Sequence, residues 1–166
     1  MLSIPISACS ISRYLAIGNL KARIRMSIIY YFANHKNYLV SGTGNKSEIL
    51  IGYFTKHGDG ACDMEPIGDL YKTEVYELSK LMDVKREIIE KPPRAGLWNN
   101  QTDEDEIGIS YDLLDQILYL YVEDMKNTEI AEKLDISVDD VDMIINKVNR
   151  NKHKSKVPES PEKTIL

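Results

Sequence analysis

An α/β domain is the fold class that this sequence predicts. Apolar residues recur at helical spacing along most of the chain, whereas residues 38–40 form one short β-type run that ends in a small-residue turn at 41–44 and leads into a helix. A lone parallel strand cannot form a sheet, because its partners must come from other parts of the fold. The chain is therefore expected to be the back half of an α/β domain, with a helical C-terminal region. One more short strand is expected within residues 2–6.

The other elements are predicted from local signals in chain order. Asn19 is expected to cap a helix that runs to about residue 34, with Leu20, Ile24 and Ile28 on one apolar stripe. Glycines and a proline predict a long loop over residues 53–69, and loops of this length are usually functional. Helices are expected over residues 46–52, 73–82, 85–91, 110–124, 128–134 and 138–149, with a mobile connection at 96–108 and an extended tail at 150–156.

Composition describes one globular domain of 166 residues, of which 43% are hydrophobic and 28% are charged. The net charge of −5 argues against nucleic acid as the main partner, because phosphate binding needs a basic surface. Two cysteines without metal-type spacing indicate a reducing cytoplasm, and no apolar stretch reaches the length of a membrane span. Residues 6–9 look like a lipoprotein cleavage site, but no basic residue precedes them, so an ordinary leading segment is expected.

Residues 41–75 are the most informative segment for chemistry. The turn at 41–44 opens a helix that carries Glu48, and Lys56, Asp63 and Lys72 follow around a Gly-Asp-Gly loop. Such a segment offers backbone N–H groups and a helix N-terminus to an anion, a carboxylate to a metal ion and two cations to phosphates. A lysine at the start of a helix opposes the helix dipole, so Lys72 is expected to have an anionic group opposite it.

In order and spacing, this segment resembles the second half of the ammonia-dependent NAD synthetases, which belong to the N-type ATP pyrophosphatase superfamily. Residues 18–23 (GNLKAR) are similar to the family pattern G-N-x-x-A-R, and residues 91–98 (KPPRAGLW) with 101–106 (QTDEDE) are similar to the family's next block. The resemblance covers residues 18–158, with 1–17 as an unmatched leading segment and 159–166 as a tail. It implies that the chain is the C-terminal part of a doubly wound parallel-sheet domain, adenine nucleotide alpha hydrolase-like in fold, with a helical C-terminal region. It also implies a cytoplasmic homodimer.

The reaction that the resemblance implies is the amidation of deamido-NAD at the expense of ATP, with Mg²⁺. In the family, the nicotinic acid carboxylate attacks the α-phosphate of ATP to give an adenylate and pyrophosphate, and ammonia then displaces AMP. A negatively charged nucleophile must approach a negatively charged phosphate, so the site needs cations. These 166 residues contain no glutaminase domain, so free ammonia is the expected nitrogen donor.

The resemblance also implies roles for individual residues, by their positions in the family's motifs. The implied deamido-NAD contacts are Arg23, Lys56, Asp63, His153 and Lys154, the implied ATP contacts are Thr43, Lys72 and Arg94, and the implied Mg²⁺ ligand is Glu48. Arg94 departs from the pattern, because a small hydroxyl residue normally touches ATP at this position. An arginine could still meet a phosphate there, although the family contact does not carry over as it stands.

The family's ATP-binding loop, Ser-Gly-Gly-x-Asp-Ser, is not found upstream of Gly18. Three explanations fit this absence: a truncated gene, a mis-called start or frameshift, or a split enzyme completed by a second chain. The alternative function is a non-catalytic remnant that binds deamido-NAD or a partner subunit. Other ATP pyrophosphatases, such as GMP or asparagine synthetases, fit residues 56–72 poorly. The stripe of Leu20, Ile24 and Ile28 could contact a second subunit or be buried within the chain.

Residues 127–150 suggest a function of another class, a helix-turn-helix module that binds DNA. Ala131 permits close crossing of two helices, and Ser137 can cap a recognition helix. Asp139, Asp140 and Asp142 lie at the N-terminal end of that helix, where contacts with DNA are made. Three acidic side chains at this point repel phosphates, so nucleic acid is not expected as a partner.

Overall fold

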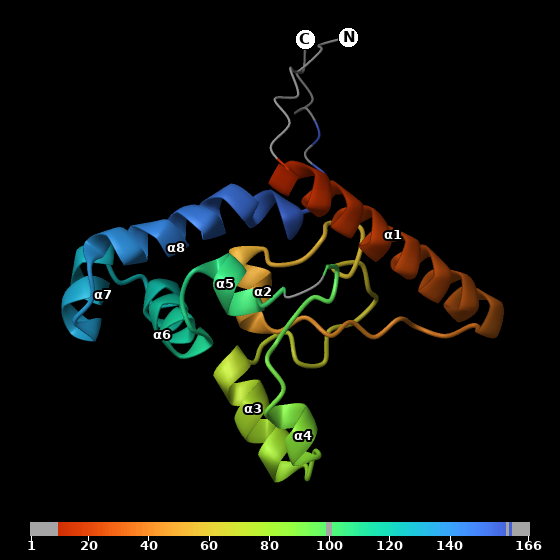
Figure 1. Cartoon of the computed structure of the whole chain (residues 1–166), viewed down its shortest axis with the longest axis horizontal. Helices are drawn as coiled ribbons and strands as arrows, with labels where there is room; N and C mark the ends of the chain where they lie inside the picture. The colour runs from red at the N-terminus through yellow and green to blue at the C-terminus, as the bar shows by residue number, and fades with distance from the viewer. Residues whose placement is uncertain (1–9, 99–100, 159, 161–166) are drawn as a thin grey trace, which may run out of the picture.

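The computed structural model describes residues 10–98, 101–158 and 160, and this part of the chain is helical. Figure 1 shows α1 along one side, α6, α7 and α8 at the opposite side, and α3 with α4 below them. In chain order the elements are α1 (Ser10–Lys36), α2 (Lys46–Ile51), α3 (Lys72–Leu81), α4 (Arg86–Ile89), α5 (Asp103–Ile107), α6 (Tyr111–Val122), α7 (Asn127–Leu134), α8 (Val138–Asn151) and the 3₁₀ helix η1 (Lys152–Lys154). None of the helices in these ranges is both long enough and apolar enough to cross a membrane.

The hydrophobic core lies between α2, α6, α7 and α8. Leu114 and Ile117 of α6, Ile130 of α7 and Ile144 of α8 are fully buried in it. The apolar residues of α6 and α8 recur three and four positions apart, which gives each helix one continuous apolar face. Full burial of one such aliphatic side chain stabilises the fold by about 1.5–3 kcal/mol, so this cluster holds the short helix α2 firmly in place.

The strand predicted at residues 38–40 is wrong, because the described part of the chain contains no strand. Its one ladder element is an isolated parallel bridge between Ser41 and Met64. The carbonyl oxygen of Val40 accepts hydrogen bonds from the backbone N–H groups of Asp63 (2.9 Å) and Met64 (3.3 Å). An extended segment becomes a strand only when a regular partner runs beside it, and here the neighbour is an irregular loop. The strand predicted within residues 2–6 lies outside the described residues.

Helix α1 begins at Ser10, well before the cap predicted at Asn19, which is an interior residue of the helix. Its side facing the rest of the molecule is built from small residues, since Gly18, Ala22 and Ala33 are buried. Figure 1 shows that α1 lies beside the loops that precede and follow α2. Small side chains allow the helix axis to come close to these loops.

Three further predictions differ from the structure. The connection predicted at 96–108 contains α5, whose N-cap residue Thr102 accepts a hydrogen bond from the N–H of Asp105. Acidic residues fill the first turn of α5, where they complement the helix dipole. The tail predicted as extended continues α8 and then forms η1, because the Asn151 side chain donates a hydrogen bond to the carbonyl oxygen of Ile51 at 2.8 Å. The helix predicted at 85–91 is present only as the short α4.

The remaining helix predictions are confirmed within two residues at each end. Asn45 caps α2, Ser110 caps α6 and Ser137 caps α8, each with its side chain accepting a backbone N–H. The long loop at 53–69 is also confirmed, with turns and bends in place of helix.

Candidate functional site

Residues from three distant parts of the chain meet at Lys56. Arg23 of α1 donates from Nε to the carbonyl oxygen of Lys56 at 3.2 Å. The Nζ atom of Lys56 donates to the carbonyl oxygen of His153 at 2.9 Å. The fold therefore brings together three of the five residues predicted to contact deamido-NAD, one each from α1, the 53–69 loop and η1.

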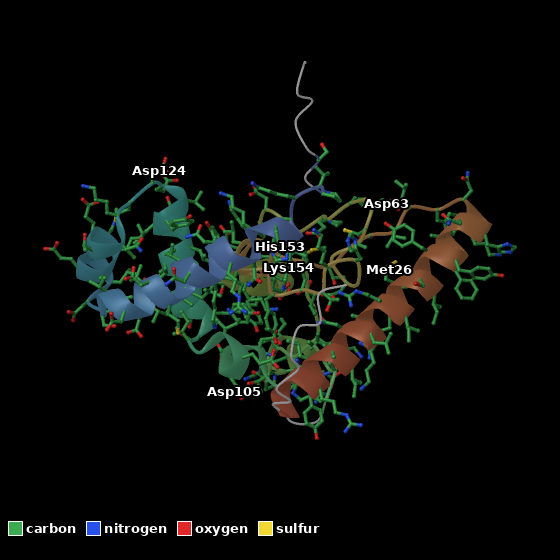
Figure 2. All side chains as sticks on the ribbon, turned by 90° about the horizontal axis from the view of Figure 1, so that it is seen from above. Met26, Asp63, Asp105, Asp124, His153 and Lys154 are labelled. Carbon is green, nitrogen blue, oxygen red and sulfur yellow. The ribbon has the colours of Figure 1, made fainter. Side chains whose placement is uncertain are left out.

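Lys154 joins this group through the backbone of the same loop. Its Nζ atom donates to the carbonyl oxygens of Gly52 (2.7 Å) and Phe54 (3.1 Å) and lies 5.6 Å from the centre of the Phe54 ring. Burial lowers the pKa of the Lys154 ammonium, while the nearby Asp59 carboxylate acts in the opposite direction. Figure 2 shows His153 and Lys154 at the end of α8, where the chain meets the loop. Lys154 thus fastens η1 to the loop.

The docking of α1 on the loop depends on Asn19, which the sequence analysis interpreted as a helix cap. The Oδ1 atom of Asn19 accepts a hydrogen bond from the Thr55 hydroxyl at 2.6 Å. A Cβ atom on Gly58 would lie 2.9 Å from Cβ of Thr55 and 3.0 Å from Cβ of Ala22, so only glycine leaves room for this approach. Asn19 and Ala22 belong to the GNLKAR motif, and their contacts place Arg23 beside Lys56.

Asp63 lies between the C-terminal part of α1 and the segment that follows this helix. Its Oδ2 atom accepts the backbone N–H of Val40 at 2.7 Å, and its Oδ1 atom accepts the Tyr30 hydroxyl at 3.3 Å. Burial and the Asp63 charge both raise the pKa of Tyr30. The Asp63 side chain remains exposed, and Figure 2 shows it on the side of the loop that faces α1.

The predicted metal ligand Glu48 and the predicted ATP contact Lys72 form an ion pair. The Nζ atom of Lys72 lies 3.2 Å from Oε1 of Glu48, and each side chain is only 17% exposed. The other carboxylate oxygen of Glu48 accepts the N–H of Asn45 at 3.3 Å, which completes a capping box at the start of α2. Lys72 is the first residue of α3, so Glu48 is the anionic group predicted to lie opposite it.

A buried carboxylate fixes the starts of α2 and α3 relative to each other. Asp115 of α6 is 5% exposed and accepts the Ser47 hydroxyl at 2.5 Å and the N–H of Thr73 at 2.8 Å. The Ser47 oxygen in turn accepts the N–H of Lys72 at 2.9 Å. These contacts set the distance between Glu48 and Lys72, and no motif in the sequence pointed to Ser47 or Asp115.

Thr43 and Arg94 are not brought into contact with these groups. Both side chains are exposed, and within the described ranges neither makes a hydrogen bond or ion pair with another predicted site residue. The turn around Thr43 is nevertheless closely packed, because a Cβ atom on Gly42 would lie 2.6 Å from the Cys62 sulfur. Thr43 is therefore held at the surface of a tight turn.

Glu48 is the single metal ligand that the sequence predicts, and its chemistry fits Mg²⁺. Among the described residues, no group of three or more His, Cys, Asp or Glu side chains is placed to hold a metal ion. Mg²⁺ is commonly bound by one or two carboxylates together with phosphate oxygens and water, rather than by a cage of protein ligands. The donor set therefore fits an ion shared with the phosphates of a nucleotide.

The chain matches the family model described as NAD synthase over residues 7–158. It belongs to the NAD synthase family. A protein named NH(3)-dependent NAD(+) synthetase from Methanocaldococcus jannaschii is 54% identical over 148 residues, which cover 89% of this chain and 57% of that protein. A protein of the same name from Sulfurisphaera tokodaii is 53% identical over 154 residues, which cover 92% of this chain and 55% of that protein.

Solved structures of the NAD synthase family share the fold. The structure described as NMN synthetase from Francisella tularensis superposes with a TM-score of 0.76 at 38% identity and covers 90% of this chain and 57% of its own. The NH3-dependent NAD synthetase from Campylobacter jejuni superposes with a TM-score of 0.69 at 36% identity and covers 89% and 56%. The fold is therefore NAD synthetase-like α/β, of which the described residues form a helical part. The chain spans little more than half the length of these relatives.

The paired helices α7 and α8 of this NAD synthase family member have the predicted helix-turn-helix form. Ile130 of α7 and Val141 of α8 are buried in the common core. Asp139 and Asp140 are exposed in the first turn of α8, where a recognition helix would approach DNA. The pairing therefore serves the core, and its exposed end carries the wrong charge for phosphate contacts.

Proposed function

We propose that this chain takes part in the ATP-dependent amidation of deamido-NAD with ammonia, which yields NAD, AMP and pyrophosphate, in the cytoplasm. The observation that supports this most directly is the meeting of Arg23, Lys56 and His153 from three distant segments. These three residues come from different parts of the chain, and together they offer an anionic ligand several contacts at once. The Glu48–Lys72 pair supplies a second polar region suited to phosphates.

The proposed chemistry has two steps. In the first, a carboxylate oxygen of the nicotinic acid ring bonds to the α-phosphorus of ATP and pyrophosphate leaves. In the second, ammonia attacks the carbonyl carbon of the adenylate, AMP leaves and a proton is released. Both reactants of the first step are anions, so the guanidinium of Arg23 and the ammonium groups of Lys56 and Lys72 lower their mutual repulsion.

We assign roles to the remaining residues on the same basis. Deamido-NAD is held by Arg23, Lys56, Asp63 and His153, with Lys154 fastening η1 to the loop, and ATP is contacted by Thr43, Lys72 and Arg94. Glu48 would hold Mg²⁺, which when bound supplies positive charge at the ATP phosphates. Lys72 exchanges Glu48 for a phosphate oxygen as ATP binds.

Isothermal titration with deamido-NAD tests the site assignment. Lys56→Ala and Asp63→Ala are each expected to weaken binding at least tenfold, about 1.4 kcal/mol. Lys80→Ala is the matched control, because Lys80 is exposed on α3 and pairs with Glu77 rather than with the site. Unchanged affinity in both site variants contradicts the assignment.

NAD formation by the purified chain, supplied with ATP, Mg²⁺, deamido-NAD and ammonia, tests catalysis separately. Turnover supports the enzymatic function, whereas binding of deamido-NAD without turnover supports the alternative of a non-catalytic binding protein, or of a chain completed by a second one that carries the Ser-Gly-Gly-x-Asp-Ser loop. Nicotinic acid mononucleotide is included as a competing substrate, since one similar structure is described as NMN synthetase.

We also propose that α1 contacts a second copy of the chain. Its outer face exposes Leu20 (57%), Ile24 (51%) and Ile28 (52%), which together with Arg23, Ser27, Tyr31 and Phe32 line an apolar groove. A helix with apolar residues on this much of its exposed surface is normally buried. Sedimentation equilibrium is expected to show a dimer that Ile24→Asp disrupts. Ile88→Asp, an equivalent change at the exposed Ile88 of α4, should leave the dimer intact. A monomeric wild type contradicts the proposal.

A further inference from the structure

The ammonium of Lys72 lies among two aromatic rings as well as beside Glu48. Its Nζ atom is 5.1 Å from the centre of the Tyr111 ring and 5.9 Å from the centre of the Tyr76 ring. A cation within about 6 Å of a ring centre is attracted by the negative face of the ring. Tyr111 belongs to α6 and is 3% exposed, so this attraction is little screened by water.

Asp103 holds the Tyr111 ring in this position. The Tyr111 hydroxyl donates to Oδ2 of Asp103 at 3.3 Å, and the Tyr53 hydroxyl donates to Oδ1 of the same carboxylate at 3.1 Å. Asp103 is 4% exposed, and its backbone N–H donates to the carbonyl oxygen of Pro93 at 3.1 Å. Each carboxylate oxygen therefore anchors one tyrosine, and the backbone anchors the carboxylate.

Asp103 belongs to the QTDEDE motif, so Tyr111 connects this motif to the Glu48–Lys72 pair. The Tyr53 hydroxyl also donates to Glu106 at 2.7 Å, and the Gln101 side chain donates to the same Glu106 carboxylate at 3.0 Å. These contacts join α5 to the loop after α2, and the Asp103 carboxylate of the same helix accepts the Tyr111 hydroxyl. No group of this motif touches Glu48 or Lys72 directly by hydrogen bond in the described part of the chain.

We infer that Tyr111, fixed by Asp103, is a positioning residue for Lys72. The ring supports the ammonium when Lys72 leaves Glu48 for a phosphate oxygen of a nucleoside triphosphate, so the cation is not lost to solvent. The inference rests on the proposed function, because it assumes that Lys72 meets ATP. It extends that function by adding Tyr111 and Asp103 to the groups on which ATP affinity depends.

Replacing Tyr111 by phenylalanine and by a series of fluorinated phenylalanines tests this role without removing the ring. Fluorine withdraws charge from the face of the ring while changing its size little. The Kd for ATP with Mg²⁺, measured by isothermal titration, is expected to rise stepwise by about fivefold in total from phenylalanine to trifluorophenylalanine. A structural role for Tyr111 would not produce this gradation. A flat series overturns the inference.

Two controls separate the possible failures. In a Lys72→Met background the fluorinated series is expected to be flat, and a gradient that persists there overturns the inference. The Kd for deamido-NAD is expected to stay constant along the series, and a parallel loss for both ligands overturns the inference as well. If the wild type does not bind ATP at all, the ATP part of the proposed function fails and the inference fails with it. A wild type that binds ATP with a flat series overturns the inference alone.

Discussion

The side chain of Lys56 reaches the carbonyl oxygen of His153 at 2.9 Å, across 97 positions of sequence. The backbone of Lys56 is held from the other side by Arg23 of α1. Both ends of this lysine are therefore fixed by parts of the chain that are remote from its own loop. The candidate deamido-NAD site depends on how the C-terminal end of α8 and η1 pack, and not only on the loop that supplies most of its residues.

Lys154→Met is expected to loosen this packing. The change keeps most of the aliphatic stem but removes the ammonium that donates to the carbonyl oxygens of Gly52 and Phe54. Loss of two charge-assisted hydrogen bonds is expected to lower the free energy of unfolding by about 1.5–3 kcal/mol, measured by urea denaturation. Lys152→Met, at an exposed position of η1, is the control and should change it little. Equal effects of the two variants would contradict the assigned contact.

Asp115→Asn is expected to destabilise the junction between α2 and α3. The carboxylate of Asp115 accepts both the Ser47 hydroxyl and the N–H of Thr73, and an amide can accept only one of them. A buried donor left without a partner costs about 1–3 kcal/mol, which thermal unfolding should detect. Asp112→Asn changes an exposed acid in the first turn of the same helix and is expected to cost less than about 1 kcal/mol. A small effect of Asp115→Asn would show that water replaces the carboxylate.

The sequence predicted most helices because their signals are local. Ser110 and Ser137 precede the apolar periodicity of α6 and α8, and each is the cap that the structure shows. Asn19 misled the prediction for the same reason, since asparagine is a favourable cap. Its side chain instead bonds to Thr55, a partner that no local pattern indicates. The prediction of a strand at residues 38–40 was wrong because a strand needs a paired neighbour, and the local sequence does not show whether one is present.

For the candidate site as well, local features could be predicted from the sequence and contacts between distant residues could not. The expectation that an anion lies opposite Lys72 came from the helix dipole and is met by Glu48. The contact between Lys56 and His153 depends on the packing of α8, so it could not be derived from spacing. Tyr111 belongs to none of the motifs from which site residues were predicted. Its proposed role follows only from the position of its ring relative to Lys72.

The free energy of unfolding is expected to fall as the pH rises above about 10. Burial is the main cause that raises the pKa of Tyr53 and Tyr111 above the ordinary value of 10.0, with nearby carboxylates adding to it. The folded chain keeps these two protons at a pH where the unfolded chain releases them. Each tyrosine therefore removes about 1.4 kcal/mol of stability per pH unit above its unfolded pKa.

The titration of two partly buried lysines changes the free energy of unfolding in the opposite direction. Burial lowers the pKa of Lys147 and Lys154 below 10.5, so their contribution to stability rises with pH and levels off about one unit above that value. Lys46, whose pKa is raised by its hydrogen bond to Asp69, loses stability over the same range as the tyrosines. The contribution of a tyrosine is therefore read from the difference in slope between wild type and variant, by urea denaturation between about pH 10.5 and 11.5. Tyr53→Phe is expected to reduce the slope by about 1.4 kcal/mol per pH unit. A slope unaffected by Tyr53→Phe contradicts the prediction.

Alanine at Gly52 and at Gly96 should separate two costs that glycine avoids. Both residues have positive φ, 68° and 64°, which costs a side-chain-bearing residue about 1–2 kcal/mol. A Cβ atom on Gly96 would meet nothing within 4 Å, whereas one on Gly52 would lie 2.3 Å from Cβ of Asn151. Overpacking adds about 1–3 kcal/mol, so Gly52→Ala is expected to lower the free energy of unfolding by that much more than Gly96→Ala in urea denaturation.

The clash also displaces Asn151 from the carbonyl oxygen of Ile51 and moves η1 away from Lys56, so deamido-NAD affinity should fall in Gly52→Ala alone. Equal losses of stability in the two variants would mean that the end of α8 yields easily, and that its packing does not define the site.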